Sequence, residues 1–230
     1  MKKIGFLLMA GALLAAAPAE AQRCIPVRAS RERPAERART EAAKAWREAL
    51  QAEVIDSLRA AGYAEPEGLV VVDVRDRRTG EAEVQTFSAP VQGEAVRALL
   101  RRREAHLATW PGRESTFYLR MDPGPAAAPD AVECEPRLLN IEQLRRDLME
   151  FAQRESRFFN SARSRERVHV RMLVDRGGEV VFAVLGRRGS EPLVDRAILD
   201  IARRQAFTPA TLGGVPIDVW VVLPIQLGAR

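Results

Sequence analysis

Residues 217–227, with the sequence IDVWVVLPIQL, alternate between two kinds of side chain almost without exception. One set is aliphatic throughout and would share one face of an extended strand: Ile217, Val219, Val221, Leu223, Ile225 and Leu227. The other set would lie on the opposite face: Asp218, Trp220, Val222, Pro224 and Gln226. Because successive side chains of a β-strand point to opposite faces, this pattern predicts one long strand with a buried face.

The segments before this strand predict a small α+β unit that begins near residue 138. A helix is expected from Asn140, because apolar residues recur there every three or four positions. Two strands over 168–174 and 180–185 follow, joined by a turn with two glycines, and Ser190 is suited to cap a second helix.

The first half of the chain repeats this order of elements. Its expected elements are a helix that ends at Gly62, strands over 69–74 and 82–87, a helix over 93–107 and a strand over 116–121. A stretch rich in proline and alanine, residues 122–137, predicts a linker. We therefore expect an α+β fold with two pseudo-repeated α-β-β-α-β units, residues 22–121 and 138–230, each with helices packed on a three-stranded antiparallel sheet. Two unrelated small domains with the same order of elements are the alternative.

The N-terminus predicts export from the cytoplasm. Lys2 and Lys3 precede an apolar run over 4–17, and a small-x-small site ends at Ala21, so residues 1–21 are expected to be a cleaved signal peptide. That run is shorter than the roughly 20 residues that cross a bilayer as a helix. The predicted location is the periplasm; the alternative is an inner-membrane protein anchored by an uncleaved N-terminus.

Export also permits disulfide formation. The chain has two cysteines, Cys24 and Cys134, which can form one bridge. Two free thiols are the alternative.

Composition argues against several classes of function. The formal net charge is +5, but acidic residues are interspersed among the basic ones, which does not favour a nucleic-acid interface. The two histidines, His106 and His169, cannot readily form a zinc site with the cysteines. Since catalytic motifs and phosphate-binding glycine loops are also missing, we expect no enzyme activity, no metal and no cofactor.

A series of short motifs resembles the C-terminal domain of the TonB family, periplasmic proteins that couple an inner-membrane motor to outer-membrane transporters. The matching residues are the strand over 170–174 with Asp175 to Val180, the helix residues Leu193 to Ile198, Phe207-Thr208-Pro209-Ala210, Gly213 to Pro216, and Leu223-Pro224-Ile225. With the helix from Asn140, the resemblance covers about two-fifths of the chain.

This resemblance implies that the last strand docks an extended peptide as an added strand. The candidate contact residues are Ile217, Asp218, Val219, Trp220, Val221, Val222, Leu223, Ile225, Gln226 and Leu227. The implied partner is a peptide of an outer-membrane transporter or of another envelope protein, in a process linked to energy-coupled transport. The same strand could also pair with a second copy and form a homodimer. A non-enzymatic envelope scaffold built from two TonB-like repeats is the alternative function.

Two residues of this strand allow further predictions. Trp220 could pack under the helix that precedes the strand, or it could form an aromatic platform beside the docking edge. Pro224 removes one N–H donor from the strand.

Overall fold

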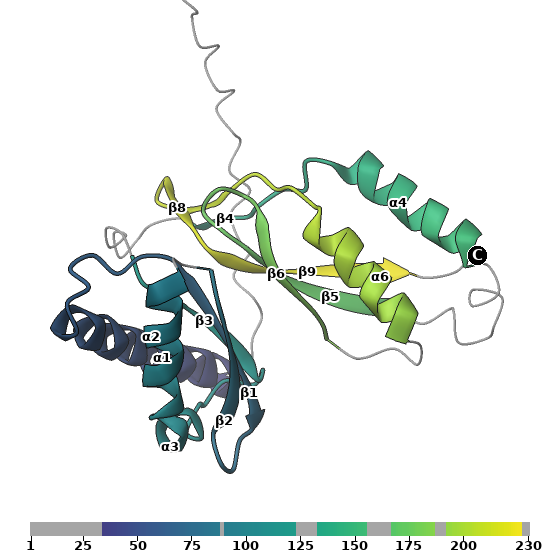
Figure 1. The fold of residues 1–230 in the computed structure, drawn as a ribbon. Helices are drawn as coiled ribbons and strands as arrows, with labels where there is room; N and C mark the ends of the chain where they lie inside the picture. Colours follow the sequence, from purple (N-terminus) through teal and green to yellow (C-terminus); the bar gives the residue numbers. More distant parts are fainter. Residues whose placement is uncertain (1–33, 88–89, 123–132, 156–166, 187–191, 227–230) are drawn as a thin grey trace, which may run out of the picture.

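The structure of this chain is a computed structural model, which describes residues 34–87, 90–122, 133–155, 167–186 and 192–226. These residues contain five helices and nine strands, and the strands form three three-stranded antiparallel sheets (Figure 1). The predicted α+β class is therefore confirmed. The predicted signal peptide lies outside the described residues. None of the described helices combines the length and apolar character that a membrane span requires.

The first half of the chain forms a sheet with the strand order β2-β1-β3. Its elements are α1 (Pro34–Ala60), β1 (Leu69–Asp76), β2 (Glu81–Thr86), α2 (Pro90–Arg101), α3 (Glu104–Leu107) and β3 (Thr116–Arg120). Gly62 ends α1 with a φ of 96°, in the left-handed region that glycine favours. The single helix predicted over 93–107 is wrong, because the chain breaks at Arg103, whose φ of −116° is not helical.

A close backbone contact accompanies this break. Gly80, in the β1–β2 turn, lies so near α3 that a Cβ atom there would be 1.7 Å from the carbonyl oxygen of Glu104. The short helix α3 thus packs directly against the β1–β2 turn.

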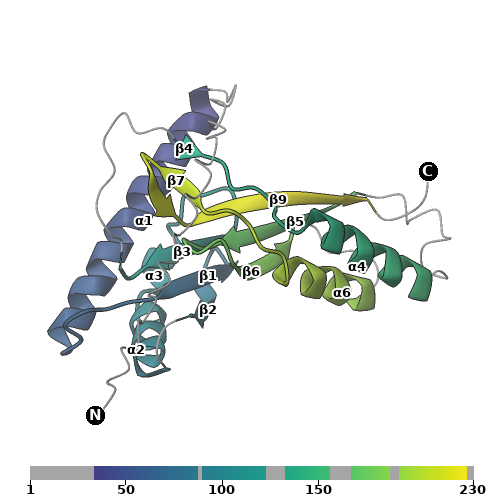
Figure 2. The ribbon, with the colours of Figure 1, turned by 90° about the horizontal axis from the view of Figure 1, so that it is seen from above.

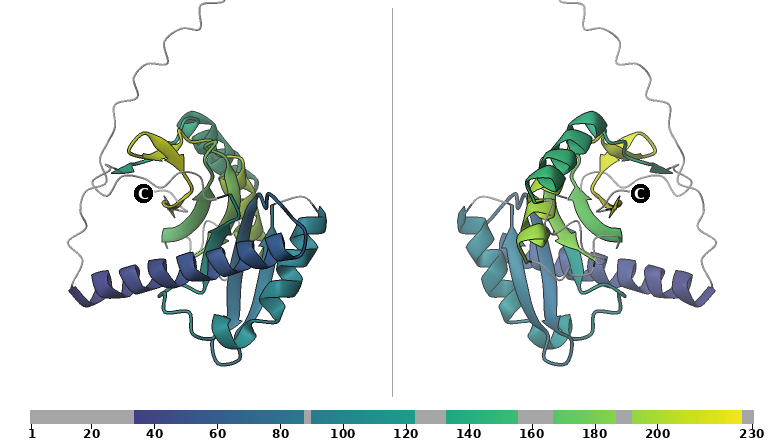
Figure 3. Two further views of the ribbon diagram at one scale, coloured as in Figure 1. Left: turned by 90° about the vertical axis from the view of Figure 1, so that its left-hand side faces the viewer. Right: turned by 90° about the vertical axis from the view of Figure 1, so that its right-hand side faces the viewer.

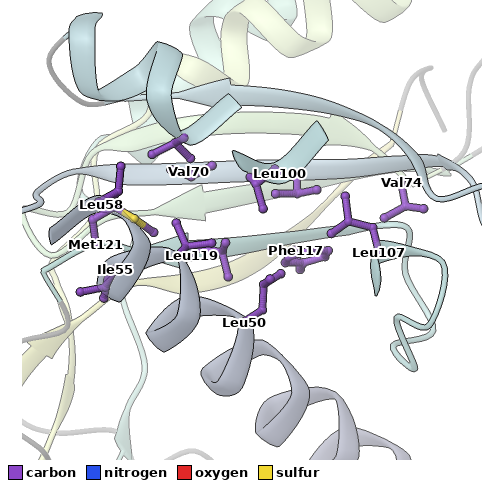
Figure 4. Close-up of a cluster of buried hydrophobic side chains, with 13 residues drawn as sticks. Leu50, Ile55, Leu58, Val70, Val74, Leu100, Leu107, Phe117, Leu119 and Met121 are labelled. Carbon is purple, nitrogen blue, oxygen red and sulfur yellow. The ribbon is translucent and has the colours of Figure 1, made fainter. Parts of the chain in front are cut away.

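One face of this sheet is buried under the three helices. Its core is made by residues at helical spacing on α1 and by alternate residues of β1 and β3 (Figure 4). The buried set is Leu50, Val54, Ile55, Leu58, Val70, Val72, Val74, Val96, Leu100, Leu107, Phe117, Leu119 and Met121. The helix predicted to end at Gly62 therefore has a real apolar face, on which the buried residues Leu50, Val54 and Leu58 recur every four positions.

The second half forms a sheet with the order β6-β5-β9. Its elements are α4 (Ile141–Arg154), β5 (Arg167–Val174), β6 (Val180–Leu185), α6 (Pro192–Arg203) and β9 (Val219–Gln226). Asn140 precedes α4 but makes no side-chain cap; its amide oxygen instead accepts from the Ala206 N–H at 3.2 Å. A third, smaller sheet has the order β4-β7-β8 and contains β4 (Glu133–Cys134), β7 (Ala210–Leu212) and β8 (Val215–Ile217). Residues 133–134, predicted to be part of the linker, thus pair with β7.

The two larger sheets place their strands in the same order relative to the sequence. In each, the first strand is central, and the second and third flank it. Gly80 and Gly178 occupy the turns between the first two strands, with φ values of 78° and 87°. A Cβ on Gly178 would lie 2.0 Å from the carbonyl oxygen of Phe207, a close approach similar to that at Gly80. These similarities are consistent with a duplication of one unit, which remains a prediction.

The two larger sheets pack against each other through the faces that the helices leave open. A small apolar cluster at this junction contains Leu69 and Val71 of β1 and Leu173 of β5, with aromatic side chains around it. The helices of the first half and of the second half therefore lie on opposite sides of the molecule (Figures 1 and 2). The N-terminal part of α1 extends beyond the sheets (Figure 3).

Candidate functional site

The candidate docking strand, β9, lies at the edge of its sheet. It pairs with β5 along its whole length, from Val219 opposite Val174 to Gln226 opposite Arg167. No described strand pairs with its other side. β9 has eight residues, whereas the other edge strands of the two larger sheets, β2, β6 and β3, have six, six and five. It is therefore the longest of these edges, and a row of unpaired backbone groups is the feature that an added strand requires.

The backbone groups of β9 can be assigned to its two sides. The Gly186 N–H donates to the carbonyl oxygen of His169 at 2.8 Å, so the backbone groups of His169 point toward β6. Since these directions alternate along a strand, the neighbouring residues Val168 and Val170 turn their groups toward β9. The register then directs Val219, Val221, Leu223 and Ile225 to β5, and leaves Trp220, Val222, Pro224 and Gln226 at the open side.

This assignment gives Pro224 a clear position. Its missing N–H falls on the open side of β9, where it removes no hydrogen bond from the pairing with β5. Proline is tolerated at this place in a sheet for that reason. The open side therefore offers N–H groups at Trp220, Val222 and Gln226, and carbonyls at all four residues.

The predicted alternation of side chains along β9 is confirmed. Val219, Val221, Leu223 and Ile225 pack into the core beneath α4 and α6. On the other face, Val222 is 53% exposed. The side chain of Gln226 and the whole of Leu227 lie outside the part of the chain that the structure describes.

The single strand predicted over 217–227 is wrong at its beginning. Ile217 belongs to β8 and pairs with Ala210, and Asp218 separates β8 from β9. Asp218 is only 8% exposed. Its carbonyl oxygen accepts a hydrogen bond from the Tyr118 hydroxyl at 2.9 Å, and its carboxylate accepts two from Arg120, one of them at 2.8 Å. These contacts occupy Asp218, so it is not available to a docked peptide in this structure.

Asp218 thus connects the start of β9 to β3 of the first half. Burial disfavours the charge of the Arg120 guanidinium, but the hydrogen bond and charge of Asp218 outweigh it, and the pKa of Arg120 lies above its ordinary value. Burial raises the pKa of Tyr118, which keeps its hydroxyl protonated as a donor. We call Tyr118, Arg120 and Asp218 the interdomain latch.

Of the two alternatives for Trp220, packing under the preceding helix is excluded. Trp220 lies on the opposite face of the sheet, at the junction with the first half. Its ring makes an edge contact with Phe182, at 6.1 Å between centroids, and the Arg171 guanidinium lies 4.7 Å above it.

Trp220 also lines a cleft that sequence reasoning missed. The cleft, of about 550 Å³, is bounded by the N-terminal half of α1, by residues 110–117 before and within β3, and by Arg171 and Trp220. Its walls come from three segments far apart in the chain. The only sign of this cleft in the sequence is the spacing of Arg39, Lys44 and Arg47 on one helix. That spacing indicates a ligand site only when the residues of the opposite wall are known.

The residues considered for metal or redox chemistry lie apart from this region or are engaged. His106 stacks on Trp46 at 4.9 Å, and His169 is exposed. Within the described ranges, no group of three or more potential ligands could hold a metal ion. Cys134 is disulfide-bonded. Cys24, the only other cysteine of the sequence, lies outside the described residues, so the pairing of the two stays a prediction.

Comparison with known proteins adds no relative to this description. No family model, no curated protein and no solved structure matches the chain. The TonB resemblance therefore rests on the sequence motifs and on the form of the last strand alone.

Proposed function

We propose that this protein is an exported, TonB-like binding protein that docks an extended peptide along the open side of β9. The partner would be a periplasmic segment of an outer-membrane transporter or of another envelope protein, in a process linked to energy-coupled transport. The observation that carries the proposal is an eight-residue edge strand with no described partner on one side.

The open side of β9 sets the strength of such a complex. Three N–H groups and four carbonyls are directed outward, so a docked strand could form up to seven main-chain hydrogen bonds. At about 1 kcal/mol net for each bond, the gross gain is about 7 kcal/mol, from which the ordering of the peptide must be subtracted. The complex would therefore be reversible, and neighbouring side chains such as Val222 would contribute selectivity.

The proposal can be tested by NMR titration of the full chain with peptides from the periplasmic N-termini of outer-membrane transporters. The expected result is a set of amide shifts at Trp220, Val222 and Gln226 that exceeds the shifts on β2. If no such peptide shifts these amides, the docking function is refuted.

The alternative function is a non-enzymatic envelope scaffold, for which we propose two TonB-like repeats packed sheet to sheet. The latch and the apolar junction between the sheets favour this alternative, because they join the two halves firmly. Hydrogen exchange distinguishes the two functions. An open docking edge gives fast exchange at Trp220 and Val222 in the isolated protein, whereas an occluded edge protects them as well as it protects Val221.

A homodimer through β9 would also protect these amides. Sedimentation at several protein concentrations separates this case, because protection by a second copy would fall as the dimer dissociates.

A further inference from the structure

The cleft between the two halves is strongly cationic. Five basic side chains line it, Arg39, Lys44, Arg47, Arg113 and Arg171, against two acidic ones, Glu36 and Glu114. The difference, five minus two, leaves three positive charges. A concave surface lined by one sign of charge concentrates ligands of the opposite sign.

Two of these arginines are held in place by aromatic rings. The Arg171 guanidinium lies over Trp220 at 4.7 Å, and that of Arg47 lies over Tyr118 at 4.8 Å. Stacking fixes the plane of a guanidinium while its N–H groups remain directed outward from the edge of that plane. Such a group is preorganised to bind a carboxylate through two parallel hydrogen bonds.

The side chain of Arg171 is only 16% exposed. Its one described hydrogen-bond acceptor is Glu114, at 3.1 Å from Nη1, and that carboxylate is 55% exposed. Burial lowers the pKa of Arg171, and Glu114 offsets this effect only in part. A ligand carboxylate that reached Arg171 would therefore supply charge compensation that the protein leaves incomplete.

The spacing of the charges indicates the shape of the ligand. Arg39 and Arg47 are eight residues apart on α1, which corresponds to about 12 Å along the helix axis. An extended peptide covers this distance in about four residues. A single compact phosphate could not contact both ends, whereas acidic side chains along a peptide could. Trp110 and Phe117 add apolar wall to the same cleft.

We propose that this cleft binds an acidic peptide segment of a partner protein, with Arg171 and Arg47 as the carboxylate anchors and with Arg39 and Lys44 as the outer contacts. This site shares Trp220 with β9, but it does not depend on the docking function proposed above.

Intrinsic fluorescence of the full chain provides a direct assay. Trp110 and Trp220 line the cleft, and the third tryptophan, Trp46, contacts Trp110 at 5.1 Å between centroids. Titration with hexaglutamate should change the emission, with a dissociation constant that weakens as salt increases. Hexaglutamine is the neutral control and should bind at least tenfold more weakly.

Charge-neutral variants locate the binding. Arg39→Gln and Lys44→Gln change exposed side chains, so folding should be kept, and together they should weaken hexaglutamate binding about fivefold. Arg171→Gln should weaken it tenfold or more. Arg145→Gln, an exposed substitution on α4 at the far side of the molecule, should leave binding unchanged.

Three outcomes would overturn the proposal: equal binding of hexaglutamine, equal affinity of the Arg39/Lys44 double variant and the original chain, or tighter binding of anionic lipid vesicles than of hexaglutamate. None of these outcomes bears on the amide shifts of Val222 and Gln226, which do not line the cleft, so the two proposals fail independently.

Discussion

Removal of one partner of the interdomain latch should destabilise the protein by several kilocalories per mole. In this latch, the side chains of Arg120 and Asp218 are only 15% and 4% exposed. Arg120→Met would leave the buried Asp218 carboxylate without the two hydrogen bonds that it accepts from Arg120. Breaking a buried ion pair from one side costs about 3–5 kcal/mol, and the nearby Asp122 does not compensate the loss of a positive charge.

The double variant makes the prediction sharper. Asp218→Asn alone should cost about 2 kcal/mol, because Arg120 keeps a hydrogen-bonding neighbour and the weaker, exposed Asp122 at 3.4 Å. When Asp218→Asn is combined with Arg120→Met, it removes the unpaired carboxylate charge that makes Arg120→Met alone destabilising. The double variant should therefore be about 2 kcal/mol more stable than the sum of the single effects predicts.

Urea unfolding of the four proteins measures this coupling. The matched control is the exposed pair Arg75 and Glu83, whose side chains are 48% and 46% exposed and whose coupling should stay below about 1 kcal/mol. A latch coupling no larger than that of the control would show that the two halves are not held together by this pair. A Tyr118→Phe variant should lower the free energy of unfolding by about 1 kcal/mol, because it loses the hydrogen bond to the Asp218 carbonyl oxygen.

Three further predictions concern Asp147, Gly178 and Val222 in the second half of the chain, with Gly62 of the first half as a comparison. Burial raises the pKa of Asp147, but hydrogen bonds from Gln143 and Arg204 outweigh this effect and hold the pKa below its ordinary value. The stability that this carboxylate contributes should be present above about pH 4 and be lost as the pH falls through the folded-state pKa. Asp147→Asn should remove that part of the acid dependence, as measured in thermal melts. Gly178→Ala should cost about 2 kcal/mol or more, because its Cβ would meet the Phe207 carbonyl, whereas Gly62→Ala, with a positive φ but open space, should cost about 1 kcal/mol in urea unfolding. Val222→Pro removes an outward N–H of β9, so circular dichroism should report a folded protein while affinity for a docked peptide falls; unchanged affinity would contradict the assignment of the open side.

Much of the architecture follows from local patterns in the sequence. The period-four apolar residues of α1, the alternation of β9 and the glycine turns each specify an element by its own residues. Each of these patterns spans only a few neighbouring residues, so the sequence alone is sufficient to predict the element. The break between α2 and α3 was missed, and the close approach of Glu104 to the distant Gly80 that accompanies it is not visible in a local pattern.

The junction between the sheets was missed for a similar reason. Asp218 was predicted to lie on one face of a long strand, but it separates β8 from β9, and its partner Arg120 lies 98 residues earlier in the chain. Neither residue alone indicates a buried pair. Only the packing of one sheet on the other brings them together.

The sequence nevertheless contained one sign of this packing. Residues 69–72 are Leu-Val-Val-Val, and all four are buried, with Val70 and Val72 beneath the helices and Leu69 and Val71 at the junction. An antiparallel strand with one solvated face alternates, whereas a strand buried on both faces is apolar throughout. The equivalent central strand, β5, departs from alternation only at Leu173, which is the residue that joins the junction cluster. Apolar residues on the second face of both central strands therefore require a second layer over each sheet, and the two sheets supply it to each other.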